Sequence, residues 1–525
     1  MLSDRQGTVI LIGYQYKENL GLRYLSACLK KKSYRVKLIV LPAAPEEVIK
    51  TIKDIQPDIV GFSLIFQNFA PDFADLISIV RRSGCFAHLT IGGHYPSFDY
   101  IQVLKSIPEL DSAIRFEGEE TLISLLEAVI KNKPLDEVKG IAWRNESGQI
   151  ITNPLRPGCM NLDLLPRPDR EDLNYKFNWL STASMIGSRG CYHNCAFCSI
   201  APFYKKNKTP GRRFRSPLEV VDEMEMLHNR GADVILFQDD DFLSGGKRGI
   251  EWAHAIASEC VRRGLNRTLR WRVSCRSDEV SQDILAPLVD GGLSHVYLGV
   301  ESGDLQNLID LNKKLTPETH MVARETLQVL NLTFDFGFML LIPWSTFNTI
   351  RNNLKFLREF AGKGEAPCGF CRTLPYAGTA IADRLKKEKR LLPGFLAKYN
   401  FEDPRLDTFH TWLYQVFNRR NNDPGGTRNL LSVLLFEAKV NLPKYPYSQL
   451  NEVVLRSLIS ISNTVMIDTV EIALDYFESK KEPPFLDDPF LEELHQHHEE
   501  EDLRIHQDIN RWCNSRLNAM FMSEI

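Results

Sequence analysis

The sequence predicts an α/β protein made of a doubly wound parallel sheet, a partial (β/α)6 barrel and a mainly helical carboxyl-terminal region. Three observations lead to this fold class. Short apolar runs alternate with amphipathic stretches in two successive series, a proline-rich segment separates the two series, and strand-like runs disappear after about residue 395. A chain of 525 residues is also long enough for about three domains.

The first series predicts a Rossmann-like domain over residues 1–152. Helical spacing occurs in Asn19 to Lys32 and in Asp72 to Arg82. Continuous apolar strands that alternate with helices indicate a parallel sheet covered on both faces, and right-handed crossovers make it doubly wound. A ligand of such a sheet sits at the carboxyl ends of the strands. The strand candidates are Thr8 to Ile12, Arg35 to Leu41, Asp58 to Ile65, His88 to Gly92 and Ser112 to Phe116.

Residues 153–180 contain four prolines and no helical or strand period, so we expect a linker there. The second series, over residues 181–390, predicts six βα units that form a partial barrel open on one side. Barrels of this kind place their chemistry at the carboxyl ends of the strands. The strand candidates are Ala183 to Ser188, Val234 to Asp239, Leu269 to Ser274, His295 to Val300, Thr333 to Ile342 and Gly369 to Leu374.

Residues 391–525 are expected to be mainly helical, because Leu430 to Val440, Leu450 to Asn463 and Met466 to Phe477 have helical spacing. The histidine-rich stretch from His495 to Asp502 could be imagined as a metal site, but an exposed charged helix is the favoured interpretation.

The composition excludes several function classes. Lys plus Arg (64) nearly balances Asp plus Glu (67), so no nucleic-acid partner is expected. The amino terminus lacks the features of a secretory signal, and no run of about 18 uninterrupted apolar residues suggests a membrane span. We therefore expect a cytoplasmic protein whose 11 cysteines stay reduced.

Three of these cysteines form the strongest motif of the chain. Cys191, Cys195 and Cys198 follow the first strand of the second series with the spacing C-x3-C-x2-C. Soft thiolates favour iron–sulfur clusters or zinc, but a structural zinc site closes with four ligands. Three local thiolates therefore favour a four-iron cluster with one iron open to an exchangeable ligand. Zinc with a distant fourth ligand, or cysteines packed as small hydrophobes, remain alternatives.

The motif and its surroundings resemble the radical S-adenosylmethionine (SAM) superfamily. Together with the Rossmann-like domain, the chain looks like the cobalamin-binding branch of that superfamily over roughly residues 8–385. The resemblance implies one [4Fe-4S] cluster on the three cysteines, SAM chelated to the open iron, and cobalamin. The segments that carry it, in the order the family shows, are Ser188 to Gly190, Cys191 to Cys198, Arg215 to Pro217, Phe237 to Phe242 (FQDDDF), Gly299 to Gly303 (GVESG) and Leu374 to Thr379 (LPYAGT).

The resemblance also implies which residues bind SAM. Phe197 corresponds to the aromatic residue beside the adenine, and Asp239 and Asp240 stand where the family binds the ammonium group. Glu301 and Ser302, at the end of the fourth strand, would hold the ribose or the methionyl part. A helix-capping turn and an ordinary strand end are the alternatives for these acidic residues.

Gly337 and Pro343 resemble the backbone contact to adenine, although Ile342 stands where a glycine usually precedes that proline. Cys368 and Cys371 form a lone C-x2-C on the sixth strand. Residues three apart on a strand point to opposite faces, so a second cluster is not expected there.

The cobalamin assignment rests on the predicted fold more than on a motif. The segment Gly13 to Gly21 (GYQYKENLG) lacks the histidine of base-replacing corrinoid domains, so no lower axial protein ligand is predicted. Ser63 could bond the displaced dimethylbenzimidazole tail, and Gly92 and Gly93 would let that tail approach the backbone. Ordinary tight turning is the alternative for the glycines. His94 is expected to be a surface or capping residue rather than a ligand.

The leading hypothesis is an enzyme that moves a methyl group from methylcobalamin to an unactivated carbon, after a 5'-deoxyadenosyl radical has abstracted hydrogen. The substrate would be a small molecule or natural-product intermediate, and the electron donor a flavodoxin or ferredoxin. The carboxyl-terminal helices are expected to close over the barrel mouth and choose the substrate. Alternatives are cyclisation, rearrangement or epimerisation without net methyl transfer, and a non-catalytic iron–sulfur or corrinoid sensor. A methylthiotransferase that acts on tRNA is disfavoured by the balanced charge.

Overall fold

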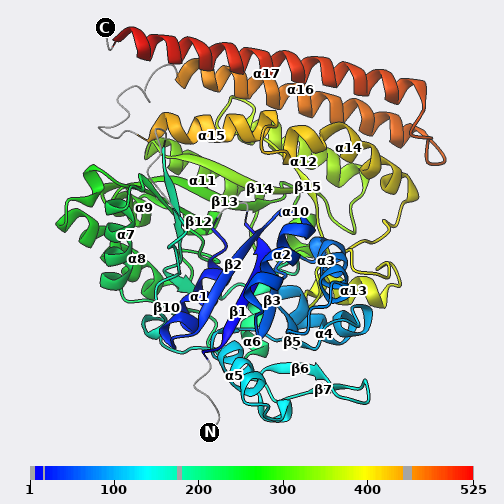
Figure 1. Cartoon of the computed structure of the whole chain (residues 1–525). Coiled ribbons are helices and arrows are strands. Elements are labelled where there is room, and N and C mark those ends of the chain that lie inside the picture. Colours follow the sequence, from blue (N-terminus) through cyan, green and yellow to red (C-terminus); the bar gives the residue numbers. More distant parts are fainter. Residues whose placement is uncertain (1–5, 16–17, 174–179, 441–451, 524–525) are drawn as a thin grey trace.

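The amino-terminal domain is a doubly wound sheet of seven strands in the order β2-β1-β3-β4-β5-β6-β7 (Figure 1). The computed structural model describes residues 6–15, 18–173, 180–440 and 452–523. The parallel strands are β1 (Thr8–Tyr14), β2 (Arg35–Leu41), β3 (Ile59–Ser63), β4 (His88–Gly92) and β5 (Ser112–Ile114). The helices are α1 (Leu20–Lys31), α2 (Pro45–Ile55), α3 (Ala70–Arg82), α4 (His94–Ser106) and α5 (Glu119–Ile130).

Alternating residues of β1 show why helices cover both faces of this sheet. Ile10 and Ile12 pack with α2, α3 and α4, whereas Val9 and Leu11 pack with α1 and α5. Successive side chains of a strand point to opposite faces, so a strand buried on both faces must be apolar throughout. The predicted fold class is confirmed.

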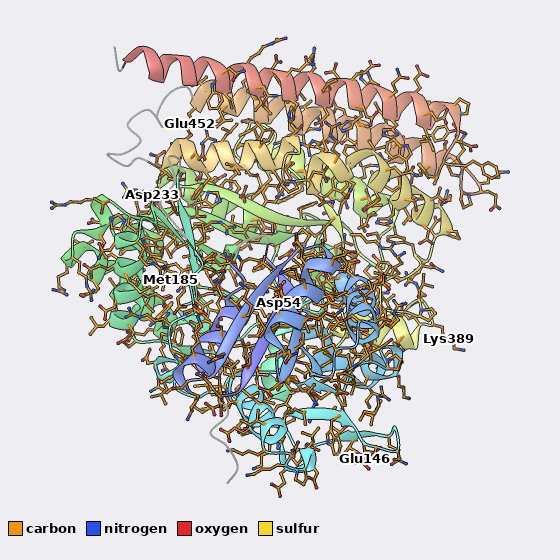
Figure 2. The ribbon with its side chains drawn as sticks, in the orientation of Figure 1. Asp54, Glu146, Met185, Asp233, Lys389 and Glu452 are labelled. Atoms are coloured by element: carbon orange, nitrogen blue, oxygen red, sulfur yellow. The ribbon has the colours of Figure 1, made fainter. Side chains whose placement is uncertain are left out.

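Two short strands of this sheet were missing from the prediction. β6 (Ile141–Arg144) and β7 (Ile150–Thr152) extend the sheet as an antiparallel hairpin. Glu146 lies in its turn, at the outer edge of the molecule (Figure 2). Strands of three or four residues are too short for a clear sequence period.

The second sheet contains six parallel strands in the order β15-β14-β13-β12-β11-β8. Because β8 and β15 stand at opposite ends of this order, the sheet is a half-barrel open on one side, as predicted. Its strands are β8 (Thr182–Met185), β11 (Val234–Phe237), β12 (Arg270–Arg276), β13 (Leu293–Glu301), β14 (Thr333–Leu341) and β15 (Cys371–Arg372). Its helices are α7 (Pro217–Asn229), α8 (Lys247–Arg262), α9 (Gln282–Asp290), α10 (Leu305–Asp310), α11 (Pro317–Val329), α12 (Phe347–Ala361) and α13 (Ala380–Lys387). The first βα connection adds the small antiparallel pair β9 (Ser188–Arg189) and β10 (Arg213–Phe214), with α6 (Ile200–Lys206) between them.

In the described part of the carboxyl-terminal region, four helices follow the barrel: α14 (Pro404–Asn422), α15 (Thr427–Lys439), α16 (Glu452–Ser479) and α17 (Pro489–Ser523). The two stretches with helical spacing between residues 450 and 477 fall within one continuous helix, α16; Leu450 lies outside the described residues. Asn463, inside α16, is fully buried, donates to Ala361 O (2.8 Å) and Ala366 O (3.0 Å), and accepts from Cys368 N (2.8 Å).

The carboxyl-terminal helices share the barrel core and lie over its open side. The ring of Phe436 on α15 lies 5.2 Å from that of His295 on β13, and Val440 packs with Val234 and Leu236. α16 and α17 stack outside α15 in successive layers (Figure 1). Among the described helices, α16 alone is long and apolar enough to cross a membrane, and half of its most apolar stretch is buried inside the protein.

The histidine-rich stretch of α17 is not uniformly exposed, contrary to the prediction. His498 is buried, and its ring centroid lies 4.4 Å from that of Phe417 on α14. Burial lowers the pKa of His498 to about 3, so the ring is neutral and packs as part of the core. The neighbouring His497 is exposed.

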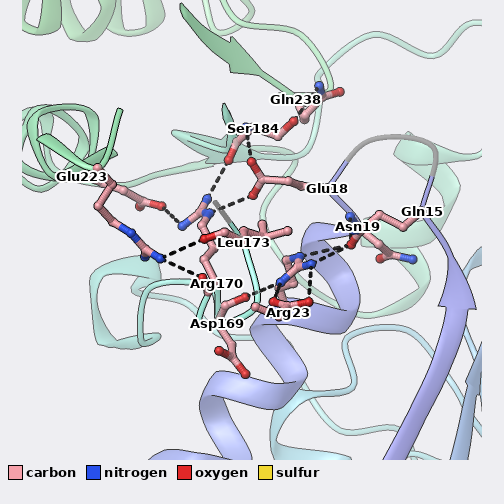
Figure 3. A network of polar contacts seen from close by, with 12 residues as sticks. Gln15, Glu18, Asn19, Arg23, Asp169, Arg170, Leu173, Ser184, Glu223 and Gln238 are labelled. Carbon is pink, nitrogen blue, oxygen red and sulfur yellow. Dashed lines mark hydrogen bonds and ion pairs between the residues drawn. The ribbon is translucent and has the colours of Figure 1, made fainter. Parts of the chain in front are cut away.

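The proline-rich segment predicted as a linker is held by buried charges to both domains (Figure 3). Arg170 donates to Glu18 (2.8 Å) before α1 and to Glu223 (2.8 Å) on α7, and it also reaches Ser184 O on β8 (2.6 Å). Its side chain is only 1% exposed. The segment therefore fixes the two domains relative to each other.

A second arginine of this network points from the amino-terminal domain to the segment. Arg23 on α1 donates to Asp169 O (2.8 Å) and to Asp172 (2.7 Å), and its side chain is fully buried. Gln15 accepts from the same guanidinium (Figure 3). Arg23 and Arg170 thus hold the proline-rich segment to the amino-terminal domain and to the barrel.

Replacing Arg170 with Met should lower the free energy of unfolding by about 3–5 kcal/mol, because the carboxylates of Glu18 and Glu223 would lose a buried cation. Urea unfolding followed by circular dichroism measures this. Arg167→Met is the matched control, since Arg167 makes partly exposed pairs with Glu219 at 3.4 Å and Asp222 at 4.0 Å, and its replacement should cost less than about 1 kcal/mol. Equal effects of the two substitutions would contradict this role of Arg170.

Candidate functional site

The three motif cysteines lie together on the loop between β9 and α6, at the carboxyl edge of the barrel. Gly190 begins this loop with a φ of +96°, and a Cβ there would lie 2.1 Å from Gly211 O, so only glycine fits. Cys198 N donates to Cys195 O (3.1 Å) and Ala196 N donates to Leu311 O (2.8 Å). These backbone bonds fix the loop before any ligand binds.

The surroundings of the thiols suit an anionic metal centre. Burial raises the pKa of Cys191 and of Cys198 to about 12, so free thiolates here would be costly without a cation. Burial also raises the pKa of Cys195, where Lys313 and Arg276 oppose the rise. Arg276 Nη1 lies 3.8 Å from Cys195 Sγ. All three residues remain partly exposed, which leaves room for a further ligand.

Two residues that sequence reasoning did not single out also face the cysteines. Potential ligand atoms of Cys191, His193 and Asp241 all lie within 4.8 Å of one another, so this set could hold a single metal ion. Burial, with Glu279 nearby, raises the pKa of Asp241 to about 8. Geometry alone therefore leaves the zinc alternative open. Both residues stand inside segments quoted for the resemblance, next to the residues that were chosen.

The two aspartates predicted to bind SAM have different surroundings. Asp239 is buried and accepts from Gly187 N (2.9 Å) and from the Ser188 hydroxyl, so it holds the loop that follows β8. Asp240 accepts from Gly190 N (2.8 Å) and presents exposed surface to a cavity. Burial raises the pKa of Asp240 to about 6, so it is ionised at neutral pH. Asp240 is the better placed of the two for a cationic ligand.

Glu301 and Phe197 converge on a lysine that the sequence analysis missed. Lys313 Nζ donates to Glu301 Oε1 (3.2 Å) and lies 6.0 Å from the centroid of the Phe197 ring. A Cβ at Gly299 would lie 2.8 Å from this ammonium, so the glycine makes room for it. Glu301 has a φ of +68°, an uncommon value for a residue with a side chain, and such strain is typical of functional sites.

Ser302 and Gly337 lie in different surroundings. The Ser302 hydroxyl is fully buried and donates to Asn353 Oδ1 (2.8 Å) on α12, so it faces away from Glu301. Gly337 lies on β14 beside Glu301, and a Cβ there would lie 2.7 Å from the hydroxyl of Tyr297. Its missing side chain gives space to Tyr297 in the barrel interior.

The lone C-x2-C does not form a paired thiol site. Cys368 is fully buried near Asn463, whereas Cys371 on β15 is exposed and donates to Phe338 O (3.5 Å). The two side chains therefore have different surroundings.

A cavity of about 760 Å³ lies between the two domains. Ser63, Gly92 and Gly93, at the carboxyl ends of β3 and β4, line one wall, and Ser188 and Asp240 line the other. The volume falls in the range of cofactor pockets, about 300–1,000 Å³. The predicted tail-binding residues and one predicted SAM residue therefore meet at one open volume.

Two glycines of this wall have distinct roles. Gly93 has a φ of +116°, and a Cβ there would lie 2.2 Å from Leu64 O, so it is required by the turn. Gly92 has no such restriction, since the nearest atoms to its Cβ position belong to Ile114 at 3.6 Å. In the described part of the chain the Ser63 hydroxyl makes no hydrogen bond and is available to a ligand. This wall fits a group that inserts at the strand ends.

His94 lines the same cavity and contacts the barrel. Its ring stacks on Phe203 of α6 with centroids 4.4 Å apart, and Nδ1 lies 3.2 Å from the Ser199 hydroxyl. Burial lowers the pKa of His94 to about 4, so the ring is neutral at neutral pH. The stacking makes His94 part of the wall between the domains rather than a surface residue.

Buried ion pairs close the cavity at the domain boundary. Glu117, after β5, pairs with Arg213 (2.7 Å) and with Arg189 (3.0 Å), which immediately precedes the cysteine loop. Arg189 also pairs with Glu119 (2.7 Å). Burial would raise the pKa of Glu117, but the two arginines outweigh it and lower the pKa. This network connects the cavity wall directly to the cysteine loop.

Comparison with family models decides the identity of both regions. Residues 9–126 match the B12 binding domain, and residues 185–357 match the radical SAM superfamily. The chain belongs to the cobalamin-binding radical SAM proteins. It is therefore a cobalamin-dependent radical SAM enzyme with a [4Fe-4S] cluster, SAM and cobalamin as cofactors. The three thiols, the cations beside them and the cavity between the domains fit these groups.

Curated relatives of this enzyme have different printed functions. An uncharacterized methyltransferase of Pyrococcus horikoshii is 28% identical over 76% of this chain and 84% of its own length. The anaerobic magnesium-protoporphyrin IX monomethyl ester cyclase of Rubrivivax gelatinosus is 27% identical over 64% of this chain. The chain spans 61% of that cyclase.

Two solved structures share the fold. The cobalamin-dependent SAM radical enzyme OxsB, with aqua-cobalamin and SAM bound, has a TM-score of 0.67 and 20% identity over 98% of this chain and 81% of its own. The radical SAM methyltransferase TsrM of Kitasatospora setae has a TM-score of 0.59 and 17% identity over 74% of this chain and 78% of its own. The likeness to OxsB includes the carboxyl-terminal helices, since it covers nearly the whole chain.

Replacing Cys195 with Ala should abolish the cluster, because only two of the three cysteine ligands would remain on the loop. Iron content and the paramagnetic signal after reduction measure this in anaerobically reconstituted protein. Cys371→Ala is the control and should keep the wild-type iron content, since Cys371 lies on β15 and not on the cysteine loop. Full iron content in Cys195→Ala would refute the assignment of the cluster ligands.

Substituting Gly92 with Leu should weaken cobalamin binding at least tenfold, because the side chain would enter the cavity without straining the backbone. Titration of the apoprotein with hydroxocobalamin, followed by visible absorption, tests this. Gly425→Leu is the control, since a Cβ at Gly425 meets open space far from the cavity. Unchanged affinity in Gly92→Leu would place cobalamin elsewhere.

Proposed function

We propose that this enzyme transfers a methyl group to an unactivated carbon of a small-molecule substrate. When bound, the cluster and SAM supply an organic radical, and methylcobalamin supplies the methyl group. The single observation that carries the proposal is the cavity between the domains, because its walls come from both cofactor-binding regions. A methyl donor held there would lie beside the residues expected to bind SAM.

The residues divide the remaining tasks among them. Cys191, Cys195 and Cys198 would hold the cluster, and Asp240 would take the SAM ammonium group at the cavity edge. Phe197 and Glu301 would contact the rest of SAM, next to Lys313. Ser63 and Gly92 would receive the cobalamin tail. His94 and Phe203 stack on each other in the wall of the cavity.

The printed functions of the relatives favour methyl transfer but include another reaction. The relative of Pyrococcus horikoshii, of which this chain covers 84%, is named a methyltransferase. Two further relatives are named hopanoid C-3 methylase, from Methylococcus capsulatus, and cytidylyl-2-hydroxyethylphosphonate methyltransferase, from Streptomyces wedmorensis. The cyclases of Rubrivivax gelatinosus and Cereibacter sphaeroides favour cyclisation without net methyl transfer as the second candidate. A flavodoxin or ferredoxin in the cytoplasm is proposed as the electron donor.

Incubation of the reduced, reconstituted enzyme with SAM carrying a deuterated methyl group and with metabolite extracts should yield a product that contains that methyl group. Mass spectrometry detects it together with deoxyadenosine. The Cys195→Ala variant is the control and should form neither product. A product that has lost two hydrogens, or has an unchanged mass, would support cyclisation or rearrangement instead. Absence of deoxyadenosine from the wild type would favour a non-catalytic sensor.

A further inference from the structure

Helix α15 brings an arginine into the open side of the barrel. Arg428 lies in the first turn of α15, and its side chain crosses Gly369, just before β15. A Cβ at Gly369 would lie 2.4 Å from Arg428 Cδ and 2.4 Å from its Nε. Because the φ of Gly369 lies outside the left-handed region, this glycine is needed for space and not for backbone conformation. The path of Arg428 into the barrel therefore depends on a missing side chain.

The guanidinium of Arg428 faces polar groups on three barrel strands. Tyr297 on β13 and Asp335 on β14 are register partners, so their side chains share the concave face of the sheet. Cys371 follows on β15. Burial raises the pKa of Tyr297 to about 12, and Arg428 opposes that rise from nearby. Tyr297 thus keeps its proton and can donate a hydrogen bond inside the barrel.

A second arginine lies beside Tyr297. The guanidinium carbon of Arg272 on β12 is 5.4 Å from the centroid of the Tyr297 ring. Arg272 stands two residues before Ser274, the register partner of Tyr297, so it belongs to the same face of the sheet. The two guanidiniums are therefore supplied by opposite sides of the interior, one by a strand and one by α15.

Several hydrogen-bonding groups of this interior lack partners. Among the described residues, Nε of Arg428 is buried without an acceptor, and Nη1 donates only to Asn429 Oδ1 at 3.3 Å. Within the described ranges, Arg272 makes no hydrogen bond at all. A guanidinium carries five donors, and buried donors are normally satisfied. Donors aimed into a protein interior without acceptors indicate a place for an acceptor-rich ligand.

The charge balance gives the sign of that ligand. Arg272 and Arg428 face one carboxylate, Asp335, whose Oδ2 lies 3.4 Å from His295 Nε2. Glu301 is engaged by Lys313. The interior therefore has an excess of positive charge. Cys371 is also a neighbour of Arg428, and its side chain is accessible rather than packed against the guanidinium.

We propose that Arg428, with Arg272 and the Tyr297 hydroxyl, binds an anionic group of the substrate, a phosphate, phosphonate or carboxylate. This names the substrate class of the proposed function and rests on it: the substrate is a small acidic molecule. Arginine suits this role because its planar fork donates two parallel hydrogen bonds to an oxyanion. The carboxyl-terminal region thereby contributes directly to substrate recognition.

Binding of inorganic phosphate, and separately of acetate, to the oxidised holoenzyme tests the proposal without turnover. The protein is loaded with the cluster, cobalamin and SAM, so the anionic groups of both cofactors already occupy their own sites. Isothermal titration should show saturable binding of one of the two anions. Preference for phosphate or for acetate then distinguishes a phosphorylated substrate from a carboxylic acid.

Arg428→Gln should raise the Kd of the preferred anion at least tenfold, and Arg428→Lys should give an intermediate value. Gly369→Ala should also weaken binding, because its Cβ displaces the Arg428 side chain while the charge stays in the protein. Arg419→Gln, on the exposed face of α14, is the matched control and should bind as the wild type does. The visible spectrum of bound cobalamin reports whether each variant is folded.

Three results would overturn the proposal. The first is that the wild type binds neither anion saturably. The second is that Arg428→Gln and Gly369→Ala bind the preferred anion as tightly as the wild type does. The third is that Arg428→Gln loses affinity for SAM and keeps its affinity for the added anion. The last result would make Arg428 a SAM-binding residue. None of these measurements depends on methyl transfer, so failure of the proposed function and failure of this anion site are distinguishable.

Discussion

The buried ion pairs around Glu117 hold together the two halves of the site. Glu117 belongs to the segment after β5 that borders the cavity, and Arg189 directly precedes the loop of the three cysteines. The side chains of Glu117, Arg189 and Arg213 are at most 11% exposed. Charges buried this deeply are stable only when they are paired, because the desolvation of an unpaired buried charge is not offset by any attraction. The network therefore forms only when both domains are in place, and it sets the distance between the cavity wall and the cluster loop.

This constraint explains why the cavity lies where it does. A doubly wound sheet and a parallel barrel each offer ligands the carboxyl ends of their strands. Here the two carboxyl edges face the same volume, with β3 and β4 on one side and the loops after β8 and β11 on the other. The proline-rich segment supports this arrangement from outside, since Arg170 bonds to both domains. The ion pairs of Glu117 and those of Arg170 thus independently fix the same relative position of the two domains.

The sequence predicted those features whose cause is local. Alternating apolar strands, such as Thr8–Tyr14, and the spacing of Cys191, Cys195 and Cys198 are visible in a few consecutive residues. Features decided by distant partners were missed or misread. The burial of Asn463 is one such feature, because its acceptors lie about 100 residues away along the chain. Ser302 could be named as a site residue from its motif, but only the structure shows that it faces Asn353.

The same distinction separates the residues proposed to bind the cofactors from the residue proposed to bind the substrate. The proposed cofactor residues stand at strand ends and in the loops that follow them, so short motifs mark them. Arg428 stands on a helix that packs across the barrel opening, and no local pattern near it indicates a ligand. Arg428 takes no part in the ion pairs of Glu117 or Arg170, so the sequence of α15 can change without disturbing the ion pairs between the two domains. A fold built in this way can keep one cofactor chemistry and exchange its substrate through the carboxyl-terminal helices.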